Sequence, residues 1–220
     1  LQTVPRRGYR LVGPVEELGP EPLVDPPPPR GRDAAIAEIA RGLDAFGAVV
    51  LAGPPGIGRT TVGRACGPGL VLTVHPDQGL VASAAAALGV AVADPRRVSV
   101  ALAALGRVLI LVDDLHHDPD AREVIERWRR EAPAARWLLT TATRTDLDRS
   151  AAVWLDGLAE TDAVALLAER SGVALDPTRP DALALVRALD GNPLALVLAA
   201  RLLRLLGPAE LAERLGERLA

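Results

Sequence analysis

The stretch that decides the fold runs from residue 48 to residue 60 and reads Ala48-Val49-Val50-Leu51-Ala52-Gly53-Pro54-Pro55-Gly56-Ile57-Gly58-Arg59-Thr60. Its first five residues are all apolar, as expected of a strand that is buried on both faces in a parallel sheet. Glycines then recur through the next six residues, and a helical pattern begins near residues 59–66. The stretch therefore predicts a buried strand, a glycine-rich turn and a helix, in that order.

The turn fits the pattern G-x-x-x-x-G-basic-T, which marks a phosphate-binding loop, or P-loop, when a strand precedes it and a helix follows. Glycines let the backbone curl so that successive N–H groups point inward at phosphate oxygens, and the helix N-terminus adds positive charge. We expect Thr60 to offer its hydroxyl to Mg²⁺ and Thr61 to contact the α-phosphate. A turn without any ligand is the alternative. The expected nucleotide-binding residues are Gly53, Pro54, Pro55, Gly56, Ile57, Gly58, Arg59, Thr60 and Thr61.

Position 59 departs from the P-loop pattern, because Arg59 stands where Lys is usual. The chain contains no Lys, and all 25 of its Lys or Arg positions are Arg. A guanidinium is larger than an ammonium and bonds as a planar fork, so the exchange is not conservative. Arg59 keeps the positive charge of Lys, but we expect its different shape to disturb the geometry of the transition state. The sequence therefore supports nucleotide binding better than hydrolysis, and we expect at most a weak ATPase.

A second apolar run, Val108 to Val112, leads directly into Asp113 and Asp114. In P-loop enzymes the first acid at such a strand end holds Mg²⁺, and the second can polarise the attacking water. Asp113 is therefore predicted to share the metal with Thr60, and Asp114 is predicted to be catalytic. The alternative is that Asp114 caps the next turn and both carboxylates are only solvated. The adjacent residues His116 and His117 are interpreted as a solvated loop, since no third ligand has a suitable spacing.

Apolar strands alternate with helices along the first two thirds of the chain, which predicts a three-layer α/β fold with a parallel sheet. Further strands are expected at 70–74, 108–112, 137–141 and 152–155. Helices are expected from Asp33, with Ile36, Ile39, Ala40 and Leu43 on one face, and near 79–88, 98–106 and 119–131. The remaining sequence predicts a small all-α bundle, with helices at 160–170, 181–189, 193–206 and 209–219.

With its motifs in this order, the chain resembles the STAND-class P-loop NTPases, signalling ATPases that include NB-ARC and bacterial regulator modules. The resemblance spans roughly residues 30–206. Residues 29–33 are similar to the entry motif of that family, which implies that Arg32 lies close to the nucleotide base. The strand from Trp137 ends in polar residues at the carboxyl edge of the sheet, where Thr141 or Arg144 can sense the γ-phosphate; an Arg on a surface loop is the alternative. Residues 139–144 resemble the sensor strand of that family with one inserted Ala, which implies that Arg144 is the catalytic sensor. Residues 190–196 resemble its Gly-x-Pro motif, which implies that Pro193 contacts the adenine.

The first twelve residues predict a β-hairpin that resembles the end of an OmpR-type winged-helix DNA-binding domain. The resemblance implies that Arg6 or Arg7 approaches DNA and that the parent protein is a transcription regulator. An ordinary basic hairpin is the alternative. Residues 13–30 are rich in Pro and predict a linker. The expected division is therefore 1–12 for the hairpin, 13–30 for the linker, 31–156 for the nucleotide-binding domain and 157–220 for the helical domain.

The bulk properties set limits on these interpretations. The chain has 220 residues, a hydrophobic fraction of 49% and a net charge of −3, which argues against the whole chain wrapping nucleic acid. Cys66 stands alone, so an internal disulfide is excluded. Apolar runs are too short to span a bilayer and no secretion leader is visible, so we expect a cytoplasmic protein. Because the chain begins at Leu1 and lacks Met, we expect it to be a fragment of a longer protein.

Four functions remain open at this point. The first is a regulatory switch that binds ATP or ADP with Mg²⁺, in which ATP favours an open, self-associating form. The second is a scaffold that keeps its nucleotide bound and does not hydrolyse it. The Arg at position 59 is the reason to consider it. The third is a DNA-binding fragment of the regulator, and the fourth is an unrelated P-loop enzyme such as a kinase or a helicase-like motor.

Overall fold

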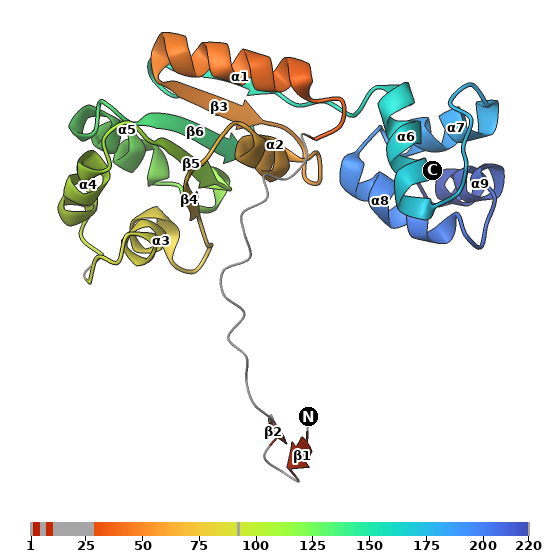
Figure 1. Ribbon diagram of the computed structural model, residues 1–220, viewed down its shortest axis with the longest axis horizontal. Helices are drawn as coiled ribbons and strands as arrows, with labels where there is room; N and C mark the ends of the chain where they lie inside the picture. Colours follow the sequence, from red (N-terminus) through yellow and green to blue (C-terminus); the bar gives the residue numbers. More distant parts are fainter. Residues whose placement is uncertain (1, 5–7, 11–28, 92, 220) are drawn as a thin grey trace.

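A five-stranded parallel sheet lies at the centre of the computed structural model, which describes residues 2–4, 8–10, 29–91 and 93–219 (Figure 1). The strands are ordered β4-β5-β6-β3-β7, and each neighbouring pair is parallel. Each strand lies within one residue of its predicted position. Their bounds are β3 Ala48–Ala52, β4 Gly69–Thr73, β5 Leu109–Asp113, β6 Arg136–Thr141 and β7 Ala151–Trp154.

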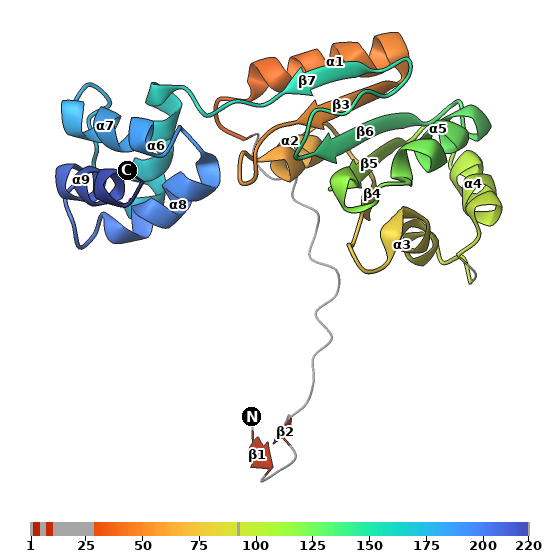
Figure 2. The same ribbon diagram turned by 180° about the vertical axis from the view of Figure 1, so that it is seen from behind.

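Strand residues alternate between two hydrophobic cores, one on each face of the sheet. Val49 and Leu51 pack with helices α1 and α2, whereas Ala48 and Val50 pack with α3, α4 and α5. Figures 1 and 2 show these two groups of helices on opposite sides of the sheet. The expected three-layer α/β fold is therefore confirmed. The helix bounds are α1 Asp33–Phe46, α2 Arg59–Ala65, α3 Gly79–Ala87, α4 Pro95–Ala104 and α5 Ala121–Glu131.

The helices that follow β7 form an all-α bundle with its own core, as predicted. Fully buried leucines from three of its helices, Leu167, Leu185 and Leu196, belong to this core. The bundle packs beside the carboxyl edge of the sheet, next to the turn that follows β3 (Figure 2). Its helices are α6 Glu160–Ser171, α7 Pro180–Ala188, α8 Pro193–Leu202 and α9 Pro208–Leu219.

Two helices differ in extent from the sequence-based expectation, and one residue differs in burial. Helix α4 begins at Pro95, earlier than predicted, because the Asp94 side chain accepts hydrogen bonds from the backbone N–H groups of Arg96 and Arg97. The spacing of apolar residues does not reveal such a cap. Helix α8 ends at Leu202, four residues earlier than predicted. On α1, Ala40 is exposed, although its spacing predicted a place on the buried face.

At the start of the chain, β1 (Gln2–Val4) and β2 (Gly8–Arg10) pair antiparallel, with Thr3 opposite Tyr9. The expected β element is therefore present. Arg6, Arg7 and the predicted linker up to residue 28 lie outside the described residues. No helix in the described part of the chain is long and apolar enough to cross a membrane.

Candidate functional site

The turn after β3 runs from Gly53 to Gly58 and leads directly into α2, so the predicted strand, turn and helix are confirmed. Gly56 and Gly58 have φ angles of 76° and 95°, in the left-handed region that favours glycine. At Gly53 a side chain is excluded for another reason, because an added Cβ would lie 2.8 Å from the Leu155 carbonyl oxygen. The glycines therefore serve both the curl of the loop and its close approach to Leu155, just after β7.

The first turn of α2 is open for a ligand. Gly58 occupies the N-cap position and has no side chain, so no side-chain hydrogen bond caps this helix. The first N–H groups of any helix lack partners within the helix and carry partial positive charge. Thr60 and Thr61 both lie in this turn, and Thr61 is exposed. The loop therefore ends in N–H donors and hydroxyls that can meet an anion.

Arg59 folds back into the loop instead of extending into solvent, and its side chain is only 11% exposed. Its Nη1 donates to the carbonyl oxygens of Gly53 and Pro54, the latter at 2.9 Å. Its Nη2 lies 3.3 Å from Asp114 Oδ1. The Nε is buried without a hydrogen-bond partner. A buried, unpaired N–H on a cation is costly, and an anionic acceptor in the loop would satisfy it.

Asp113 and Thr60, the predicted metal pair, are brought together. Thr60 Oγ1 donates to Asp113 Oδ1 at 3.0 Å, and Asp113 is only 4% exposed. A third residue, Thr140, also donates to Asp113 Oδ1, at 2.6 Å, and accepts the N–H of Asp114 at 3.0 Å. Thr140 holds both acidic residues at the end of β5, although the sequence analysis did not name it.

The pairing of β5 with β6 places Thr140 beside Asp113. Val112 lies opposite Leu139 in this pair, so the next residues on the two strands, Asp113 and Thr140, are neighbours. The sequence pattern alone does not specify this register. Thr141 is fully buried, and its Oγ1 accepts the N–H of Thr143 at 3.3 Å.

Asp114 has a left-handed backbone with φ of 59°, which is unfavourable for a residue other than glycine. Its side chain makes no capping hydrogen bond to the 3-10 helix η1 (Leu115–His117) that follows. The alternative in which Asp114 only caps the next turn is therefore wrong. Its carboxylate instead forms the ion pair with Arg59 and is 31% exposed.

The two histidines are solvated as predicted, but they lie in the 3-10 helix η1 and not in a loop. Both are exposed, and their ring centroids lie 4.2 Å apart. Partial burial and the neighbouring His117 lower the pKa of His116 below its ordinary value. Among the described residues, no group of three or more His, Cys, Asp or Glu side chains is arranged to hold a metal. A Mg²⁺ site made of Thr60, Asp113, water and phosphate needs no such group.

Arg32 and Arg144 flank the end of β7. Arg32 is buried and donates to the carbonyl oxygens of Asp156, at 2.8 Å, and Ile57, at 3.0 Å. It thus ties the loop to the chain segment that leads into the bundle, and its burial lowers the pKa of the guanidinium. Arg144 lies over the indole of Trp154, with 4.8 Å between the guanidinium carbon and the ring centroid. Trp154 Nε1 in turn donates to Asp156 Oδ1 at 3.0 Å.

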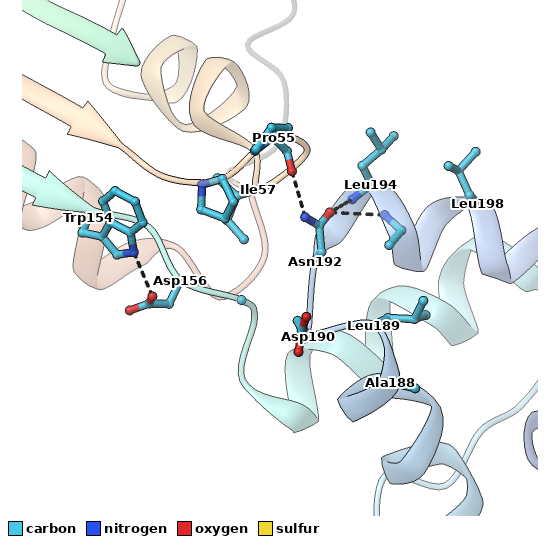
Figure 3. A pocket seen from close by; sticks show the side chains of 13 residues that line it. Pro55, Ile57, Trp154, Asp156, Ala188, Leu189, Asp190, Asn192, Leu194 and Leu198 are labelled. Carbon is cyan, nitrogen blue, oxygen red and sulfur yellow. Dashed lines mark hydrogen bonds between the residues drawn. The ribbon is translucent and has the colours of Figure 1, made fainter. Parts of the chain in front are cut away.

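A cleft of about 710 Å³ lies between the loop and the bundle (Figure 3). This size is typical of small-molecule sites. Pro193, which the resemblance placed against adenine, is not among the residues that line the cleft, whereas its neighbours Asn192 and Leu194 are. The wall is mostly apolar and includes Pro54, Pro55, Trp154, Asp156, Leu194 and Leu198.

Comparison with known proteins supports the fold. No family model and no curated protein matches the chain. A Walker-type ATPase of Pyrococcus abyssi is 14% identical and superposes over 86% of this chain and 71% of its own, with a TM-score of 0.65. RuvB of Thermotoga maritima is 16% identical and superposes over 87% of this chain and 70% of its own, with a TM-score of 0.54. The chain therefore has the fold of the P-loop ATPases.

A STAND protein with a tetratricopeptide repeat sensor from Pyrococcus horikoshii is 18% identical, over 73% of this chain and 28% of its own. Its TM-score of 0.49 is too low to support the narrower STAND assignment. None of these three proteins supports the transcription-regulator context. Both assignments stay predictions.

The hydrogen bonds of Thr140 generate a test of the site's architecture. Replacing Thr140 with Val keeps the shape of the side chain but removes the donor to Asp113 and the acceptor for the Asp114 N–H. We expect Thr140→Val to lower the free energy of unfolding by about 1–3 kcal/mol, because buried polar groups lose their partners. Chemical denaturation followed by circular dichroism measures this. The matched control is Thr143→Val at an exposed position, and equal effects of the two substitutions would refute the assigned role of Thr140.

Proposed function

We propose that this chain is a nucleotide-binding switch module, in which the loop from Gly53 to Thr60 binds the phosphates of ATP or ADP. The observation that carries the proposal is the contact of 3.0 Å between Thr60 Oγ1 and Asp113 Oδ1 at the end of that loop. A hydroxyl and a carboxylate that converge beside a glycine-rich loop are the ligands expected for Mg²⁺ on a nucleotide phosphate.

The loop has donors suited to phosphate oxygens. Arg59 contributes an Nε that is buried and unpaired. Its Nη1 and Nη2 are bonded to loop carbonyls and to Asp114, so a phosphate would have to replace these contacts to engage the guanidinium fork. The uncapped first turn of α2 adds backbone N–H groups and the hydroxyls of Thr60 and Thr61. These donors are arranged around one loop, so a diphosphate would satisfy several of them together.

Thr60 and Asp113 would hold a Mg²⁺ ion, and Thr140 keeps the Asp113 carboxylate in place. When bound, Mg²⁺ neutralises phosphate charge and aligns the phosphate oxygens. We propose that the nucleoside enters the cleft beside the loop, where Trp154 supplies an aromatic wall. The preference for adenine rests on the family resemblance, as does a contact of Arg32 or Pro193 with the base. No guanine-reading Asn-Lys-x-Asp motif occurs in the sequence.

The second candidate, a nucleotide-holding scaffold with little or no hydrolysis, is favoured by the ion pair between Arg59 and Asp114. Asp114 is the residue proposed to polarise the attacking water, yet its carboxylate faces the guanidinium that replaces the usual Lys. While this pair persists, the carboxylate oxygen that faces Arg59 is not free to orient an attacking water. The proposed catalytic set of Asp114, Arg59 and Arg144 would therefore support at most slow turnover.

The wider biological role rests on the order of the sequence motifs. We propose a STAND-type switch in which ATP favours an open, self-associating form and ADP a closed one, with the bundle moving against the sheet. A cytoplasmic transcription regulator is the proposed parent. Contact with DNA would involve Arg6 or Arg7, which lie outside the described residues, and the winged-helix part that the hairpin resembles.

Thr60 provides the test of nucleotide and metal binding. We expect Thr60→Val to weaken Mg-ADP binding by roughly tenfold, because the metal loses a protein ligand, and to abolish most of the gain in affinity that Mg²⁺ gives the wild type. Titration with a fluorescent ADP analogue, with Mg²⁺ or with EDTA, measures both effects. Thr143→Val serves as the control and should bind as the wild type does. A Thr60→Val variant with unchanged Mg²⁺ dependence would contradict the assignment.

Arg59→Lys separates the two candidate functions. If the module is a switch whose turnover is limited by Arg59, restoring the compact ammonium should raise the rate of phosphate release several-fold, because the Asp114 carboxylate is freed. Steady-state release of phosphate from ATP measures this, and Asp114→Ala should return the rate of Arg59→Lys to background. A scaffold would show tight ADP binding with no turnover in either form. A lower rate in Arg59→Lys than in the wild type would count against the role given to the ion pair.

A further inference from the structure

Helix α8 touches the phosphate-binding loop through the residue that caps it. Asn192 is the N-cap of α8, and its Oδ1 accepts the backbone N–H groups of Leu194, at 3.1 Å, and Ala195, at 3.3 Å. Its Nδ2 donates to the carbonyl oxygen of Pro55 at 2.9 Å (Figure 3). A single side chain thus bonds both to the start of a bundle helix and to the loop after β3.

The orientation of this amide is fixed by its surroundings. Backbone N–H groups can only donate, so the atom that they meet at the start of α8 must be the Asn192 oxygen. The NH₂ group is then turned toward the loop, where the Pro55 carbonyl is an acceptor. An amide side chain of this size offers an acceptor for the helix N-terminus and a donor that points the opposite way.

A second contact lies next to the first. The N–H of Leu194 also donates to the carbonyl oxygen of Gly56 at 3.2 Å. Gly56 itself must lack a side chain for α8 to come so close, because an added Cβ would lie 2.8 Å from Leu194 Cβ and 2.9 Å from Asn192 Oδ1. The bundle is therefore seated on the backbone of two consecutive loop residues.

These contacts determine which way the loop's N–H groups point. The C=O and N–H of one trans peptide are directed oppositely, and the described residues contain no cis peptide. A donor held on the Pro55 carbonyl therefore also fixes the direction of the Gly56 N–H, on the other side of the same peptide plane. A donor on the Gly56 carbonyl does the same for the next peptide.

We infer that Asn192 is a positioning residue that latches the helical bundle onto the phosphate-binding loop and aims the Gly56 N–H at a bound phosphate. The inference rests on the proposed function for its phosphate, but the latch itself is a property of the protein without nucleotide. It differs from a merely structural cap, because a cap needs only the Oδ1 atom. Substitutions that keep the cap and remove the donor therefore separate the two roles.

Asn192→Ser and Asn192→Asp make this separation. Ser and Asp both cap helices well, but neither donates to the Pro55 carbonyl: the Ser side chain is too short and the carboxylate is an acceptor. Because Asp also adds a negative charge near the loop, Ser is the decisive variant and Asp the supporting one. The matched control is Asp94→Ser, which exchanges the N-cap of α4, where the side chain only accepts from Arg96 and Arg97.

Two readouts on the full chain are needed. The first is acrylamide quenching of tryptophan fluorescence without nucleotide: Trp154 lines the cleft and is 37% exposed, whereas Trp128 and Trp137 are 0% and 1% exposed. We expect both Asn192 variants to show stronger quenching than the wild type, because the cleft opens, and Trp154→Phe to abolish the difference. The second is Mg-ADP affinity, which should fall roughly three- to tenfold, as for the loss of one hydrogen bond.

The outcomes are distinguishable. If quenching increases in Asn192→Ser but wild-type protein binds no nucleotide, the latch stands and the proposed function fails. If the wild type binds Mg-ADP while Asn192→Ser matches it in both quenching and affinity, the latch is refuted and the proposed function stands. An effect on affinity in Asn192→Asp alone would assign it to charge and would also overturn the inference. Equal effects in Asp94→Ser would reduce Asn192 to an ordinary cap.

Discussion

The backbone from Gly53 to Gly56 keeps its shape because each of its four carbonyl oxygens meets a donor from elsewhere. Arg59 Nη1 bonds the first two, Asn192 the third and the Leu194 N–H the fourth. Each of these hydrogen bonds favours the loop conformation in which donor and acceptor meet. Arg59 Nη1 belongs to the helix that follows the loop, whereas the other two donor groups lie at the start of α8, where Asn192 is 137 positions beyond Pro55. The conformation of the loop therefore depends on contacts from both the α/β part and the helical bundle.

Arg59 links the stability of this loop to its chemistry. The guanidinium that holds two loop carbonyls also pairs with Asp114, so the proposed phosphate binding and the proposed catalytic role involve the same side chain. A phosphate that engages Arg59 would have to compete with these partners, and Asp114 would be released only as the competition succeeds. The left-handed backbone of Asp114, fixed by Thr140, holds the carboxylate in reach of this exchange. This competition is the physical reason for our proposal that turnover, if the nucleotide binds as proposed, is slow.

Much of the fold could be predicted from local sequence patterns. Buried parallel strands are continuous apolar runs, and the apolar residues on the buried face of a helix recur every three to four residues. Asp113 and Thr60 could be paired because parallel strands end at one edge of the sheet. What could not be predicted depends on contacts between distant segments. Thr140 needs the register of β5 and β6, the Arg59 pair needs side-chain conformation, and the Asn192 contact needs the docking of the bundle. Ala40 and the start of α4 differ because periodicity alone ignores caps and exact helix phase.

We propose that the loop from Gly53 to Thr60 is built around the phosphates of a nucleotide. Isothermal titration of nucleotide-free protein with Mg-ADP, and in parallel with adenosine, tests it most directly. We expect saturable binding of one Mg-ADP per chain and at least tenfold weaker binding of adenosine, because the phosphates meet Arg59 and the loop N–H groups. Equal affinities for the two ligands, or no heat with Mg-ADP from folded protein, would contradict the account.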